Sequence, residues 1–141
     1  MSMITFLTEN VQMPPLNVPK TIKWMQLVAA NYGFVVGNLN YIFCDDDKIL
    51  QVNQAFLQHD YYTDVITFDY STSTVLSGDV FISLDTVRSN AQMVEDTFER
   101  ELDRILIHAL LHLTGQEDKT PETKQVMTQK EEKALELRNQ L

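Results

Sequence analysis

LDRILIHALLHLTGQED, residues 102–118, is the stretch that decides the fold. Its apolar residues cover most of the circumference of a helix, which predicts a helix buried at the centre of the protein. His108 and His112 lie four residues apart and therefore share one face of that helix. Gly115 can end the helix in a left-handed turn, which lets the chain fold back and bring Asp118 toward the two imidazoles. Two imidazoles and a carboxylate that converge form a site for a first-row metal ion with open coordination positions.

The histidine pair also fits a peptidase site or a purely structural role, but both are less favoured. Zinc peptidases place a glutamate directly after the first histidine as the general base, and this chain has Ala109 there. The pair could also be core histidines that are hydrogen-bonded to carbonyl groups. However, so apolar a helix makes two unpaired imidazoles costly, and an acidic side chain follows just past the turn. The pattern therefore favours a metal site.

The flanking sequence predicts a small sheet and further helices. Runs rich in β-branched and aromatic residues predict strands at 4–7, 39–43, 64–68 and 79–83. The last two should form an antiparallel hairpin around the polar loop 71–74. Capping residues predict helix starts at five points: Asn17 or Val18, Asp45, Asp85, Asp96 with Glu99 as a capping box, and Thr120 with Pro121. The helix after Asp45 should direct inward four apolar side chains: Ile49, Leu50, Val52 and Phe56.

The predicted fold class is α+β. We expect residues 1–141 to form a single domain in which helices cover a small mixed sheet. The metal site should lie on the central buried helix and on the turn that follows it. The 44% hydrophobic and 22% charged composition is typical of a globular protein, and no apolar run is long enough to span a bilayer.

The charge of the chain is acidic and uneven. The net charge is −9, and residues 45–103 alone carry thirteen acidic side chains against three basic ones. This composition argues against RNA as a partner unless a local basic strip or a metal ion offsets the field. The N-terminus lacks the pattern of a secretory signal. The single cysteine, Cys44, excludes an internal disulfide and, with no secretory signal, predicts a cytoplasmic protein.

Three blocks of the sequence resemble one family. His108, Leu111, His112, Leu113 and Gly115 match the signature HGxLHLxGYxH of the YbeY family, a set of bacterial metal-dependent endoribonucleases. Residues 63–68 (TDVITF) resemble the family's TDVLSF strand, and residues 78–82 (GDVFI) resemble its GDI strand. The resemblance extends from about Leu50 to Thr120 in the family's order and spacing.

The resemblance implies a zinc site with one unusual ligand. The third histidine of the signature falls on Asp118, so His108 and His112 would share the metal with a carboxylate. Zinc accepts a carboxylate, but this harder ligand also opens the site to manganese, iron, cobalt or nickel. The family's glycine and tyrosine are replaced by Ala109 and Gln116.

The resemblance also identifies residues near the expected substrate. An arginine that engages RNA phosphate in the family is replaced by Leu57, and Arg88 is a candidate substitute or a solvated surface residue. Glu117 is a candidate general acid or base beside the ligand Asp118, or an exposed side chain. Three further residues could contact substrate or could simply belong to a loop or turn: His59, Thr63 and Asp64.

The resemblance implies hydrolysis of single-stranded RNA during ribosomal RNA maturation. The metal would activate a water molecule and polarise the phosphoryl oxygen, and the partners would be ribosomal RNA and the small subunit or its assembly factors. A non-catalytic, metal-binding ribosome-assembly factor is the alternative, favoured by Leu57 and the acidic composition. An iron enzyme that uses oxygen ranks last, because two histidines and a carboxylate fit it but nothing in the chain suggests a cosubstrate pocket.

Overall fold

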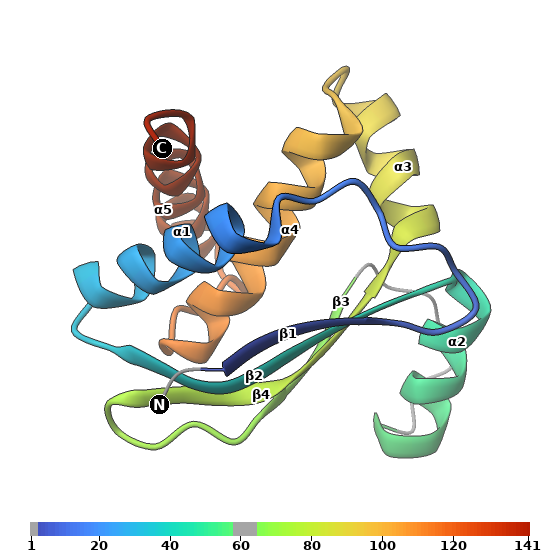
Figure 1. The fold of residues 1–141 in the computed structure, drawn as a ribbon, viewed down its shortest axis with the longest axis horizontal. Coiled ribbons are helices and arrows are strands. Elements are labelled where there is room, and N and C mark those ends of the chain that lie inside the picture. Colours follow the sequence, from blue (N-terminus) through green and yellow to red (C-terminus); the bar gives the residue numbers. More distant parts are fainter. Residues whose placement is uncertain (1–2, 58–64) are drawn as a thin grey trace.

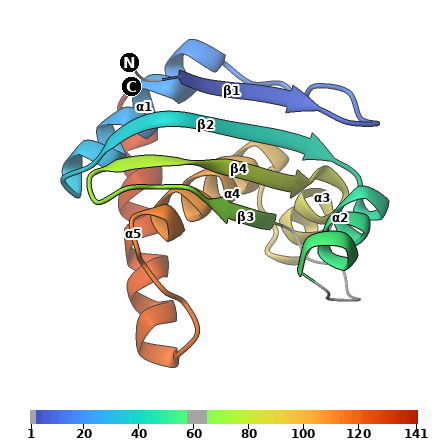
Figure 2. The ribbon, with the colours of Figure 1, turned by 90° about the horizontal axis from the view of Figure 1, so that it is seen from below.

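A computed structural model describes residues 3–57 and 65–141, and the strands in these ranges form one mixed sheet. The strands are β1 (Met3–Thr8), β2 (Val35–Cys44), β3 (Val65–Asp69) and β4 (Val75–Ser83). Their order is β1-β2-β4-β3: β1, β2 and β4 run parallel, and β3 is antiparallel to β4 (Figure 2). The predicted mixed sheet and hairpin are confirmed, and β2 is longer than the predicted strand 39–43.

Helices cover one face of this sheet. The helices of the described residues are α1 (Val18–Asn31), α2 (Asp46–Val52), α3 (Leu84–Met93), α4 (Phe98–Leu113) and α5 (Pro121–Asn139); a π-helical turn, Asn53–Leu57, continues α2. Figure 1 shows α1, α3, α4 and α5 on the same side of the strands, whereas α2 lies at the end of the sheet. The predicted α+β class is therefore confirmed.

The central position predicted for α4 is confirmed. Nine of its sixteen residues are buried, and they face the sheet, α1, α3 and α5. The hydroxyl of Tyr41 on β2 donates to the carbonyl of Leu106 at 2.9 Å, which ties the sheet to the middle of α4. The indole of Trp24 on α1 donates to the carbonyl of Ala134 on α5 at 2.7 Å. These two buried hydrogen bonds therefore fix α4 on the sheet and α1 on α5.

The helix caps confirm some predictions and correct others. Asn17, Asp45 and Thr120 cap α1, α2 and α5 as predicted. The predicted capping box of Asp96 and Glu99 is wrong: Thr97 caps α4, and the Asp96 carboxylate instead accepts from the amide of Thr97.

The predicted cap of α3, Asp85, is also wrong, by two residues. Ser83 is the cap, because β4 runs directly into α3 without a loop. Asp85 lies in the first turn and accepts a hydrogen bond from the amide of Asp46 at 3.1 Å. The acidic side chain thereby joins α3 to the start of α2.

A smaller apolar cluster lies between α2 and the sheet. Cys44, Ile49, Val52 and Ile66 form its buried part, and burial raises the pKa of the Cys44 thiol to about 12. The inward orientation predicted for Phe56 is wrong, because the chain leaves α-helical geometry at Asn53 and the Phe56 side chain is 69% exposed. Among the described residues, no helix has both the length and the apolarity that crossing a membrane requires.

Candidate metal centre

The structure brings together the three residues predicted as metal ligands. His108 and His112 occupy successive turns at the end of α4, on one face. Gly115 has φ +98°, a left-handed conformation that turns the chain back as predicted. Oδ2 of Asp118 consequently lies 3.4 Å from Nε2 of each histidine, and the two Nε2 atoms are 3.0 Å apart.

The other nitrogen of each imidazole is held by an acceptor. Nδ1 of His108 lies 2.5 Å from Oε2 of Glu131 on α5, and Nδ1 of His112 lies 2.9 Å from the carbonyl oxygen of Gln116. A carboxylate and a carbonyl only accept hydrogen bonds. Both Nδ1 atoms are therefore donors, and each neutral ring presents the lone pair of Nε2 to the centre.

The donor set fits a metal ion. Two Nε2 atoms and a carboxylate oxygen, all of them metal-ligand atoms, face one another within 4.8 Å. A metal ion between these atoms would be bound by all three groups. Ligand atoms bound at 2.0–2.1 Å to a tetrahedral ion are about 3.3 Å apart, which is close to the observed 3.0 and 3.4 Å. All three side chains are partly buried, between 16% and 31% exposed.

Glu131 is a site residue that the sequence patterns did not identify. It is only 5% exposed although it lies on a highly charged helix. Its neighbours along one helix face, Met127, Ala134 and Leu135, are buried as well. That spacing is the signal that could have identified it, because an acid on the apolar face of a helix must have a partner.

A cavity of about 260 Å³ adjoins two of the three ligands, His108 and Asp118, on the side of α5. Arg104, His108, Asp118 and Glu131 line it together with residues from the first turns of α5. Lys124 is among these residues and brings a cation to the rim of the centre. A cation next to open coordination positions can contact an anionic substrate.

Neither Glu117 nor Arg88 lines the cavity beside the ligands. Glu117 is exposed, and its carbonyl accepts a hydrogen bond from the side chain of Gln116. Arg88 on α3 lies over the ring of Phe98, 5.4 Å from its centroid, and pairs with Asp85 at 3.7 Å. Phe98 begins α4 and precedes His108 by about 15 Å of helix.

Several sequence predictions fall on a part of the chain that is not described. His59, Thr63 and Asp64 lie outside the described residues, and Leu57 is the last residue of the π-helical turn. The part of the predicted strand that is described, β3, pairs with β4 in the register Phe68 to Asp79.

Comparison with known proteins gives one family. A family model described as Endoribonuclease YbeY matches residues 4–139. A protein of that name from Phocaeicola vulgatus is 55% identical over 135 residues, covering 96% of this chain and 98% of the relative. Another, from Bacteroides thetaiotaomicron, is 50% identical with the same coverage. The solution structure of a Thermotoga maritima protein superposes with a TM-score of 0.66 at 28% identity, covering 98% of this chain and 93% of the other.

Proposed function

This chain belongs to the YbeY endoribonuclease family, and we propose that it is a metal-dependent enzyme that hydrolyses phosphodiesters in single-stranded RNA. The observation that supports the metal dependence is the convergence of two imidazole nitrogens and one carboxylate oxygen. Glu131 and the Gln116 carbonyl hold the two imidazole rings in this orientation. Within this proposal, His108, His112 and Asp118 hold the metal. Zinc is the expected ion, and manganese, iron, cobalt or nickel are compatible with the carboxylate ligand.

The residues of the centre would hold the metal ion and attract the RNA phosphate. A bound divalent cation supplies Lewis acidity toward a phosphoryl oxygen and lowers the pKa of water. Asp118 contributes one negative charge and the two neutral imidazoles none, so a divalent ion with its three ligands would keep one positive charge toward phosphate. Lys124 at the rim adds to this attraction. We propose that Glu117, which is exposed and precedes Asp118 in the chain, acts as the general acid or base. The role of Arg88 as a contact for the RNA phosphate stays a prediction.

The biological substrate is proposed from the family resemblance. Ribosomal RNA, processed in the cytoplasm together with the small subunit or assembly factors, is the substrate that the resemblance implies. A non-catalytic assembly factor would bind metal and RNA without cleaving the RNA. Cleavage that is lost on chelation and restored by added metal would exclude this alternative.

The assignment of the ligands is tested with His112→Ala. We expect the purified wild-type chain to contain about one metal ion per molecule and to cleave a single-stranded RNA. The variant should lose both the metal and the cleavage, because two ligands do not hold a catalytic metal ion. Gln116→Ala is the matched control, since it removes an amide side chain in the next turn and keeps the carbonyl that holds His112. Unchanged metal content in His112→Ala, or cleavage by a metal-free variant, would contradict the proposal.

A further inference from the structure

Arg104 lies on α4 one turn before His108 and joins two buried carboxylates. Its guanidinium binds Glu101 through two nitrogens, Nε to Oε1 at 2.8 Å and Nη2 to Oε2 at 2.5 Å. Its Nη1 lies 3.3 Å from Oε1 of Glu131. The side chains of Glu101 and Glu131 are only 3% and 6% exposed. Because a buried carboxylate is costly unless it is paired, Arg104 stabilises both carboxylates in one orientation.

The two oxygens of Glu131 have different partners. Oε1 faces Arg104 on α4, and Oε2 faces Nδ1 of His108. Rotation of this carboxylate would therefore break both contacts. Arg104 itself is held by the two-nitrogen contact with Glu101, which uses the planar geometry that lysine lacks. The orientation of the His108 ring thus depends on a chain of contacts that begins two turns earlier on α4.

We infer that Arg104 is a positioning residue for the metal centre: anchored by Glu101, it fixes Glu131 so that Nε2 of His108 stays directed at the metal. The inference rests on the proposed metal site and adds a determinant of its affinity. Partners of this kind, which orient a ligand without touching the metal, typically change metal affinity 10- to 100-fold.

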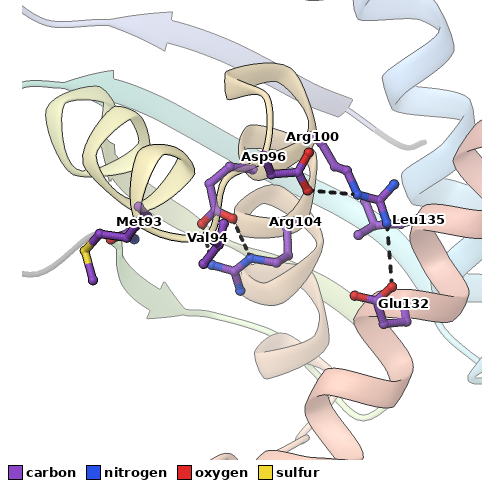
Figure 3. Close-up of a pocket in the computed structure, with 9 residues that line it drawn as sticks. Met93, Val94, Asp96, Arg100, Arg104, Glu132 and Leu135 are labelled. Carbon is purple, nitrogen blue, oxygen red and sulfur yellow. Dashed lines mark hydrogen bonds and ion pairs between the residues drawn. The ribbon is translucent and has the colours of Figure 1, made fainter.

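Arg100 supplies a matched control. It lies one turn before Arg104 on α4, and both arginines line the same cavity between α3, α4 and α5 (Figure 3). Arg100 pairs with Asp96 at 3.1 Å and with Glu132 of α5 at 3.6 Å. It therefore also ties α4 to α5, but the Glu132 side chain is 57% exposed and neither partner contacts a ligand histidine. Its replacement removes one charge and one helix–helix contact and leaves Glu131 in place.

The experiment titrates the full metal-free chain with Co²⁺ and records the visible absorption of the bound ion. We expect Arg104→Lys to weaken Co²⁺ binding by roughly ten-fold and to change the spectrum, because a lysine cannot hold both carboxylates in a fixed geometry. Arg104→Met should weaken binding further. Arg100→Met should bind Co²⁺ like the wild type. Circular dichroism of each metal-free variant checks folding. If Arg104→Met does not fold, Glu101→Gln replaces it, because this substitution removes the charged carboxylate that anchors Arg104.

Three results would overturn the inference, and they can be told apart. If the wild type does not bind Co²⁺, the proposed metal site fails together with the inference. If the wild type binds and Arg104→Lys binds equally well with the same spectrum, only the inference fails. If Arg100→Met weakens binding as much as Arg104→Lys, the effect arises from the general contact between α4 and α5, and Arg104 has no special role.

Discussion

Gly78 shows how one residue permits two strands to pair closely beside the end of α4. It lies on β4 opposite Asp69 of β3, and a Cβ atom at this position would overlap the carbonyl oxygen of Phe68. The same Cβ would lie 3.5 Å from Leu113, the last residue of α4. The absence of a side chain therefore permits the close pairing of β3 with β4, whereas the contact with Leu113 would be an ordinary van der Waals contact.

We expect Gly78→Ala to lower the free energy of unfolding by about 1–3 kcal/mol, the usual cost of an overpacked site. The clash is with a backbone atom, so the whole strand β3 must move to relieve it. Gly37→Ala on β2 is the control, because the two atoms within 3 Å of its Cβ, Oγ of Ser77 and Cγ1 of Val75, belong to side chains and not to the backbone. Urea unfolding of both variants measures the difference. An equal loss in the two variants would contradict this prediction.

Single residues also show which part of the site a sequence can predict. His108, His112 and Asp118 are close in the sequence, so helical spacing and one left-handed glycine are enough to bring them together. Glu131 reaches His108 across 23 residues and through the packing of one helix on another. Helical periodicity in α5 can indicate that Glu131 is buried, but it does not indicate that its partner is His108 on another helix.

At the scale of elements, the start of α5 anchors the loop that carries Asp118. Thr120 forms a reciprocal capping box with Thr123, and Pro121 occupies the first turn, so the chain enters α5 in a fixed direction two residues after the ligand. This cap can be predicted from the sequence because threonine followed by proline is a local signal. The predicted cap of α4 is misplaced by one residue, since Asp96 and Thr97 are both good caps and local sequence does not choose between them.

We expect Thr120→Ala to destabilise the metal-free protein by about 0.5–2 kcal/mol, because the amide of Thr123 loses its acceptor. Thr128→Ala is the control, since Thr128 is exposed within the same helix and alanine is favourable there. Thermal or denaturant unfolding of the two variants gives the comparison. If Thr120→Ala is as stable as Thr128→Ala, the capping box does not stabilise α5.

At the scale of the whole molecule, the excess of acidic side chains lies outside the sequence segment that carries the metal centre. The net charge is −9, but residues 104–141 carry six acidic and six basic side chains. The three ligands and the cavity beside them all belong to this balanced segment. The protein can therefore be acidic as a whole and still present a locally positive site once a divalent cation is bound, which resolves the conflict between its composition and an RNA substrate.

This charge distribution predicts weak salt dependence of RNA binding. A centre that contacts one or two phosphates of a single strand should lose only about three- to seven-fold in affinity between 50 and 200 mM salt, since each contact contributes a slope of about 0.7. Fluorescence anisotropy with a short single-stranded RNA and the metal-loaded wild-type chain measures that slope.

Lys124→Gln removes the cation at the rim of the centre and should flatten the slope by about 0.7. Lys133→Gln, on the part of α5 that faces α1, should leave it unchanged. A slope equivalent to six or more phosphate contacts would show that RNA follows an extended basic path, and would contradict recognition centred on the metal.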